Sequence, residues 1–207
     1  MAMTTRTPPN NSFKPNPLRG SAYSGVSART MLIRDYNGQG NWSVEAVQQR
    51  YLEHCGRLDV AVPRDLQPKT YKRPEATWIY PIMEPVIEGI KAGDPACATL
   101  GVEFIEQDCT FPFGRVLKSN AARALKSAGL SQALKNRIRR RVAAMLAAGN
   151  TPREFKEYAR LLRKVGFDEL WPRMAASAPT GSKYAMRYFT YFRAIQERSA
   201  AVIPGGR

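Results

Sequence analysis

The clearest chemical pattern in the sequence is a row of cationic side chains on one side of a helix predicted over residues 152–165. At about 100° per residue, the apolar residues of this segment fall on one side of the helix and the cations on the other. The apolar side carries Phe155, Tyr158, Leu161, Leu162 and Val165. The cationic side carries Arg153, Lys156, Arg160, Arg163 and Lys164. Guanidinium and ammonium groups pair readily with phosphate oxygens. We therefore expect this helix to bury one side and present the other to a polyanion.

Residue types that carry out catalysis are sparse. His54 is the only histidine in the chain, and its neighbour Cys55 points about 100° away from it on a helix, so the two side chains rarely meet. Glu103, Glu106 and Asp108 could hold a divalent metal for phosphodiester cleavage, but carboxylates on one side of a helix usually face solvent. The sequence has no glycine-rich phosphate loop, no nucleophile elbow and no zinc-finger spacing. We expect no enzymatic activity, no metal site and no cofactor.

The positive charge of the chain is concentrated in its C-terminal half. The 207 residues include 32 Lys and Arg against 17 Asp and Glu, for a net charge of +15. Residues 111–207 hold twenty of these cations and five of the acids, whereas residues 41–110 hold seven cations and eleven acids. Such an uneven distribution indicates a polyanionic partner more strongly than a uniformly high isoelectric point does. A basic surface that serves only solubility is the alternative.

Three consecutive helices are predicted in this basic half, over about residues 116–127, 132–148 and 152–165. The segment Thr151-Pro152-Arg153-Glu154 matches a capping box with proline at the first helical position, so it predicts the start of the third helix. Gly149 ends the second helix only two or three residues earlier. A connection this short makes the last two helices close neighbours, as in an αα-hairpin or a helix-turn-helix unit.

The second of these helices is the most charged. Lys135 and Arg139 lie along one edge of its apolar stripe. Arg137, Arg140 and Arg141 cover the opposite side. Arginine outnumbers lysine here, which suits bidentate contacts to phosphate or guanine.

A last helix is predicted from its N-cap Ser182 to about residue 200, with Lys183 and Arg187 alongside an aromatic stripe. The stripe consists of Tyr184, Tyr188, Tyr191, Phe192 and Ile195. Aromatic residues at this helical spacing more often belong to a core than to a platform on which bases stack. We therefore expect the tyrosines to be buried, with base stacking as the alternative.

Residues 145–155 are similar to the first helix, the turn and the start of the second helix of a DNA-binding helix-turn-helix. The helix that follows Thr151 is about one turn too long for that motif. The segment at the position of the recognition helix, residues 167–174, is short, begins with acidic residues and is expected to end at Pro172. The sequence therefore predicts a basic helical surface and no named family.

The N-terminal half is predicted as an arm followed by a small subdomain. Residues 1–40 are rich in Pro, Asn, Ser and Gly and are expected to form a disordered basic arm. Residues 41–110 are expected to form an acidic helical subdomain with a loop over 57–76. Its predicted helices follow the N-cap Ser43, cover about residues 81–92, and follow the Asp94-Pro95 pair.

Together these patterns predict an all-α protein: a disordered N-terminal arm (1–40), an acidic helical subdomain (41–110) and a basic helical bundle (111–207) with a helix-turn-helix-like unit. The favoured function is non-enzymatic nucleic-acid binding, regulatory or architectural. Duplex DNA is favoured over RNA because no RNA-binding motif is visible. The residues expected to contact nucleic acid are Lys135, Arg137, Arg139, Arg140, Arg141, Arg153, Lys156, Arg160, Arg163, Lys164, Lys183 and Arg187.

The alternative function is a helical adaptor or assembly protein. Such a protein would dock on acidic protein surfaces, or would form a homo-oligomer through its oppositely charged halves, with the acidic subdomain as the contact. No run of about 18 apolar residues occurs, so no membrane partner is expected. Three widely spaced cysteines and the lack of a secretory signal favour a cytoplasmic location.

Overall fold

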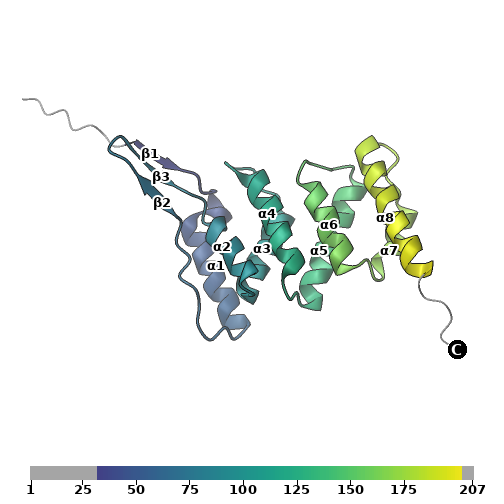
Figure 1. The fold of residues 1–207 in the computed structure, drawn as a ribbon, viewed down its shortest axis with the longest axis horizontal. Helices are drawn as coiled ribbons and strands as arrows, with labels where there is room; N and C mark the ends of the chain where they lie inside the picture. The colour runs from purple at the N-terminus through teal and green to yellow at the C-terminus, as the bar shows by residue number, and fades with distance from the viewer. Residues whose placement is uncertain (1–31, 202–207) are drawn as a thin grey trace, which may run out of the picture. The chain divides into compact units, whose positions relative to one another are not determined.

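The structure is a computed structural model of the chain, and it describes residues 32–201. These residues belong to one compact unit. Within this range the chain forms eight α-helices and one small sheet, so the prediction of a helical protein is confirmed (Figure 1). Residues 1–31, which make up most of the predicted arm, lie outside the described residues.

A three-stranded sheet, which the sequence did not predict, lies at one end of this unit (Figure 1). Its strands are β1 (Leu32–Asp35), β2 (Thr70–Lys72) and β3 (Ala76–Ile79), in the order β1-β3-β2. β1 runs parallel to β3, and β2 pairs with β3 in an antiparallel hairpin across a turn from residue 73 to 76. The expectations of an arm through residue 40 and a loop over 57–76 were therefore wrong at these strands. Three or four residues are too few to show the alternation that identifies a strand.

The first three helices are α1 (Val44–Arg57), α2 (Met83–Lys91) and α3 (Pro95–Gln107), and a 3₁₀ turn over Gly40–Trp42 precedes α1. The predicted caps of α1 and α3 are confirmed. Ser43 Oγ accepts a hydrogen bond from the Ala46 N–H at 3.2 Å. Asp94 Oδ1 accepts from the N–H groups of Ala96 and Cys97 at 2.9 and 3.0 Å, with Pro95 at the first helical position.

The remaining helices are α4 (Gly114–Ser127), α5 (Gln132–Ala147), α6 (Phe155–Val165), α7 (Leu170–Ala176) and α8 (Lys183–Ala201). They follow one another side by side away from the sheet (Figure 1), and α6 packs against α4, α5 and α8. The predicted caps Ser131 and Ser182 are confirmed, since their hydroxyls accept from the N–H groups of Leu134 and Ala185, each at 3.3 Å.

The start of α6 differs from the prediction. The helix begins at Phe155, and its N-cap residue Glu154 has helical φ (−68°) and makes no capping hydrogen bond, so Thr151 and Glu154 form no capping box. The Glu154 carboxylate is buried and instead pairs with Lys118 Nζ of α4 at 3.3 Å. The expectation for Pro172 was also wrong: this residue lies inside the first turn of α7, where a proline breaks no helical hydrogen bond, and does not end the segment.

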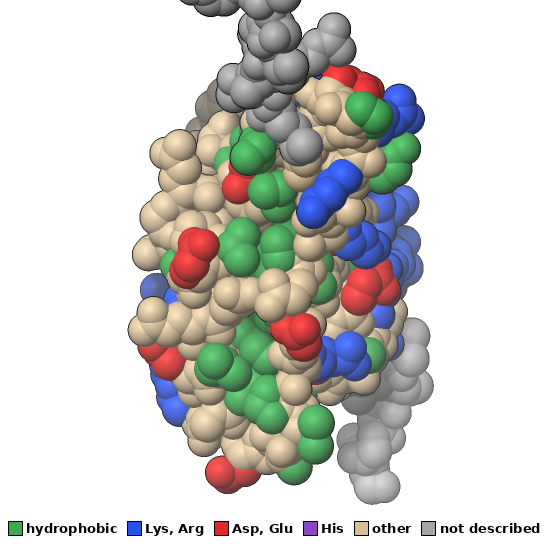
Figure 2. Space-filling model, turned by 90° about the vertical axis from the view of Figure 1, so that its left-hand side faces the viewer, with side chains coloured by type: hydrophobic (Ala, Val, Ile, Leu, Met, Phe, Trp, Pro, Cys, Tyr) green, Lys and Arg blue, Asp and Glu red, His purple; other side chains and the backbone are tan. Residues whose placement is uncertain are grey.

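The buried apolar side chains form one continuous core, which extends from Trp42 through α6 to Phe192. The change from acidic to basic composition near residue 110 falls within this core. The proposed boundaries between arm, acidic subdomain and basic bundle therefore stay predictions. At the sheet end, by contrast, hydrophobic side chains gather on the surface (Figure 2), and Leu32 and Ile33 of β1 are exposed.

Candidate nucleic-acid interface

Helix α6 separates its two sides as the sequence predicted. Phe155, Tyr158, Leu161 and Leu162 are buried in the core. Arg153, just before the helix, and Lys156, Arg160, Arg163 and Lys164 on it are exposed. Arg160 pairs with Glu157 of its own helix at 2.9 Å, whereas the other four cations make no ion pair with any residue in the described range.

A groove of about 630 Å³ lies between α6 and α8, bounded by Ala159, Tyr191 and six further side chains. The six are Lys156, Arg160 and Arg163 from α6 and Tyr184, Arg187 and Tyr188 from α8. Four of these side chains are cationic, and within the part of the chain that the structure describes no Asp or Glu lines the groove. Because each added cation raises the local potential, the groove attracts anions more strongly than the same charges spread over the surface would.

The tyrosines of α8 line this groove, and the sequence prediction placed one of them wrongly. The fully buried stripe of α8 consists of Ala185, Phe189 and Phe192, so the buried side is turned by about one residue from the predicted stripe. Tyr184 is 68% exposed as a result. The sequence carries a signal for this orientation of α8. Ala185 lies four positions before Phe189 and seven before Phe192, a spacing that places all three on one side of a helix. Tyr184 is thus a candidate site residue that sequence reasoning assigned to the core.

Tyr188 lines the groove and packs against the hydrophobic core. It is half-buried, and its ring lies edge-on to Phe155 with the centroids 4.8 Å apart. Burial raises the pKa of its phenol, and the positive charges of Arg187 and Arg160 oppose this increase. The net pKa is above the ordinary value. The hydroxyl therefore stays protonated at neutral pH and can donate a hydrogen bond to an anion.

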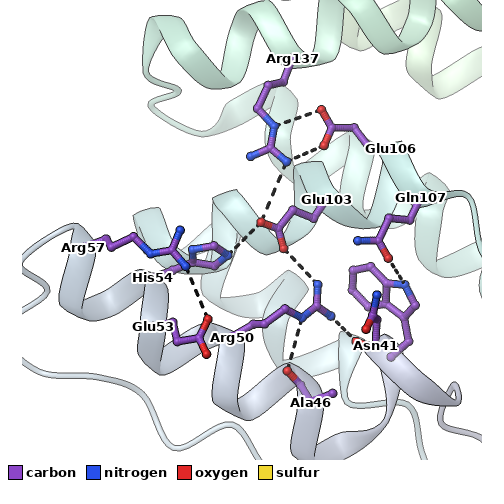
Figure 3. A network of polar contacts seen from close by, with 11 residues as sticks. Asn41, Ala46, Arg50, Glu53, His54, Arg57, Glu103, Glu106, Gln107 and Arg137 are labelled. Atoms are coloured by element: carbon purple, nitrogen blue, oxygen red, sulfur yellow. Dashed lines mark hydrogen bonds and ion pairs between the residues drawn. The ribbon is translucent and has the colours of Figure 1, made fainter.

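The arginines of α5 mostly have partners inside the molecule. Arg137 contacts the Glu106 carboxylate of α3 through two nitrogens, with Nε 3.0 Å from Oε1 (Figure 3). These hydrogen bonds raise the pKa of the Arg137 guanidinium. Arg141 donates to the Ile105 carbonyl at 3.2 Å and pairs with Asp108 at 3.3 Å. Both side chains tie α5 to the C-terminal end of α3.

Arg139 is buried, and it stabilises the end of α6. Its guanidinium donates to the carbonyl oxygens of Val165 and Gly166, the latter at 2.9 Å, and pairs with Asp168 at 2.7 Å. Carbonyls at a helix C-terminus lack hydrogen-bond donors within the helix, and the buried guanidinium of Arg139 supplies the missing donors. We assign Arg137, Arg139 and Arg141 a structural role and leave them out of the proposed interface.

The remaining predicted site residues do not line the groove. Lys183 is exposed at the first position of α8, Arg153 precedes α6 and Lys164 lies in its last turn. Lys135 and Arg140 lie on α5, and Arg140 lines a separate hollow of about 340 Å³ beside α7. Of the twelve predicted residues, the structure therefore brings four into one groove: Lys156, Arg160, Arg163 and Arg187.

The carboxylates considered as catalytic candidates form ion pairs with basic side chains of this chain, and His54 and Cys55 are buried. Glu103 Oε1 lies 3.0 Å from His54 Nε2, and its other oxygen pairs with Arg50 at 3.1 Å (Figure 3). The backbone continues from α3 to Asp108, whose carboxylate pairs with Lys118 and Arg141. Over residues 32–201, no three His, Cys, Asp or Glu side chains gather as a metal site would require.

Comparison with known proteins identifies no relative: no family model, no curated protein and no solved structure matches this chain. The groove is therefore interpreted from its own residues. Among the helices described, none combines the length and the apolar character needed to cross a membrane.

Proposed function

We propose that this protein binds nucleic acid without catalysing a reaction, and that the groove between α6 and α8 is the contact surface. One observation carries the proposal. Lys156, Arg163 and Arg187 line a single groove and have no ion-pair partner among the residues described. Open cations of this kind exchange small counterions for phosphates, and the release of the counterions drives the association.

The rest of the basic half supports the same partner. Arg153 precedes α6, Lys164 lies on α6 and Lys183 lies on α8, and all three are exposed, so they add positive charge to the helices that form the groove. Such cations would fix the position of a backbone without selecting its sequence. DNA is proposed ahead of RNA, in a regulatory or architectural role, on the sequence argument that no RNA-binding motif occurs.

The test is fluorescence anisotropy of labelled duplex DNA and of single-stranded RNA, titrated with the full chain at about 50 and about 200 mM salt. The decisive variant reverses three groove charges, Lys156→Glu, Arg163→Glu and Arg187→Glu. We expect it to lose affinity by at least about 100-fold at the lower salt, because phosphate contacts supply most of such binding. Its helicity by circular dichroism should stay unchanged, since all three side chains are exposed.

The matched control reverses three exposed cations outside the groove, Arg34→Glu, Lys72→Glu and Arg115→Glu. Both variants change the net charge by the same amount, so only position distinguishes them. Equal loss of affinity in both variants would show that net charge alone determines binding, and would refute the groove as the contact surface. Absence of binding to either nucleic acid at the lower salt would favour the adaptor that docks on acidic proteins.

Self-association is a second candidate, favoured by the sheet end. β1 pairs on only one side with a described strand, and Ile33 on it is 64% exposed. An edge strand with exposed apolar side chains is a template for pairing with another strand. We propose a second copy of this chain as the partner. Light scattering after size exclusion should show a dimer that Ile33→Lys disrupts and the control Val62→Lys, in an exposed loop, leaves intact.

A further inference from the structure

We infer that the groove between α6 and α8 receives an unpaired stretch of nucleic acid, with at least one base stacked on the ring of Tyr184. The inference rests on the proposed function and adds the class of strand that this site takes. Three features of the groove support it: the exposure of Tyr184, the spacing of the tyrosines, and the placement of the cations around them.

Tyr184 presents its ring to solvent. It is 68% exposed, and within residues 32–201 it makes no aromatic contact and no hydrogen bond. The neighbouring aromatic residues of α8 behave differently, since Tyr188 packs on Phe155 and Phe189 stacks on Trp171 with the ring centroids 5.9 Å apart. A tyrosine excluded from an available core and placed in a cationic groove is suited to stack on a base.

The tyrosines follow one line along the helix. Tyr184, Tyr188 and Tyr191 are four and three residues apart and all contribute to the groove. At about 1.5 Å per residue, the line from the first to the last is about 10 Å long. That length matches about three base steps of about 3.4 Å each. A short run of stacked bases can therefore lie along α8.

The cations lie where the backbone of such a strand would run. Lys156, Arg160 and Arg163 form the wall contributed by α6, and Arg187 lies on α8 between the tyrosines in sequence. Phosphates can pair with this wall while the bases meet the rings, which is the combination found in grooves that bind single strands. In a duplex the base faces are covered by neighbouring bases, so an unpaired stretch is the form that this groove can use fully.

The experiment compares Tyr184→Ala with Tyr184→Phe in anisotropy titrations. The probes are oligo-dT, oligo-U and a duplex of equal phosphate number, each with the full chain. We expect Tyr184→Ala to weaken binding of both single strands by about 5- to 150-fold, the range that removal of one base stack gives. Tyr184→Phe should stay within about twofold of the wild type, because the ring remains. The ratio between wild type and Tyr184→Ala should not change with salt, since stacking is not ionic.

Two results separate this inference from the function on which it rests. If single strands bind, the groove charge reversal abolishes the binding and Tyr184→Ala leaves it unchanged, then the stacking inference is overturned while nucleic-acid binding stands. If no probe binds at low salt, both are overturned. The control Tyr71→Ala removes an exposed tyrosine of the sheet end and should alter no affinity.

Discussion

At the scale of single residues, burial decides which of the three thiols can react. Burial raises the pKa of the Cys97 thiol, and the negative charge of Asp94 raises it further. Cys55 is also buried, whereas Cys109 is partly exposed. Because the thiolate is the reactive form, we expect a thiol reagent at about pH 8 to modify one cysteine of the folded protein, Cys109, and all three in denaturant. Cys109→Ser should abolish the reaction of the folded protein, and a rapid reaction that survives this change would contradict the burial.

Tyr158 carries a buried hydroxyl that has no hydrogen-bond partner within the described residues. Burial raises its pKa, and the charges of Glu154 and Asp108 add to the increase. We expect Tyr158→Phe to raise the free energy of unfolding by about 1 kcal/mol at neutral pH, because an unpaired buried polar group is removed.

The same raised pKa determines the sign of a pH effect. The hydroxyl keeps its proton in the folded chain and loses it in the unfolded chain near the ordinary phenol pKa of about 10. Its contribution to stability is therefore complete below about pH 10 and falls as the pH rises above it. Urea denaturation at about pH 8 and about pH 10.5 should show a larger loss of stability for the wild type than for Tyr158→Phe, and equal losses would count against the buried hydroxyl.

At the scale of elements, the packing of α2 on α3 depends on a glycine. A Cβ added at Gly89 would lie 2.3 Å from Cys97 Sγ and 2.9 Å from Cys97 Cβ, so the two helices would have to separate. We expect Gly89→Ala to destabilise the protein by about 1–3 kcal/mol in urea denaturation. Gly56 lies in α1 with nothing within 4 Å of the added carbon. Gly56→Ala should stabilise the protein by up to about 1 kcal/mol, because alanine favours a helix. The opposite order would contradict the packing.

The helices also show which elements a sequence can predict. The caps at Ser43, Asp94, Ser131 and Ser182 involve bonds to residues two or three positions away, so their local patterns were sufficient. The capping box at Glu154 failed because Lys118, 36 positions earlier in the chain, draws its carboxylate into the core. The sheet was missed for the same reason, since β1 pairs with a strand more than forty residues away.

At the scale of the whole molecule, the net charge of +15 predicted a surface that binds a polyanion, but it did not predict where that surface lies. Periodicity favoured the cations of α6 most strongly and kept those of α5 as candidates. The fold uses Arg137 and Arg141 to join the basic segment to Glu106 and Asp108 of the acidic one. Ion pairs of this kind depend on how α5 lies against α3, and periodicity along one helix cannot predict them. Lys156 and Arg163 of α6 and Arg187 of α8 line one groove and have no ion-pair partner among the described residues.

The most direct test of the groove is the salt dependence of single-strand binding. The logarithm of the dissociation constant is measured against the logarithm of the salt concentration for the wild type, for Arg163→Ala with Arg187→Ala, and for the control Arg34→Ala with Lys72→Ala. Each phosphate of a single strand that is no longer neutralised by the protein lowers the slope by about 0.7, so the groove variant should be shallower by about 1.4. The control should keep the slope of the wild type. An unchanged slope in the groove variant would contradict the placement of the nucleic acid between α6 and α8.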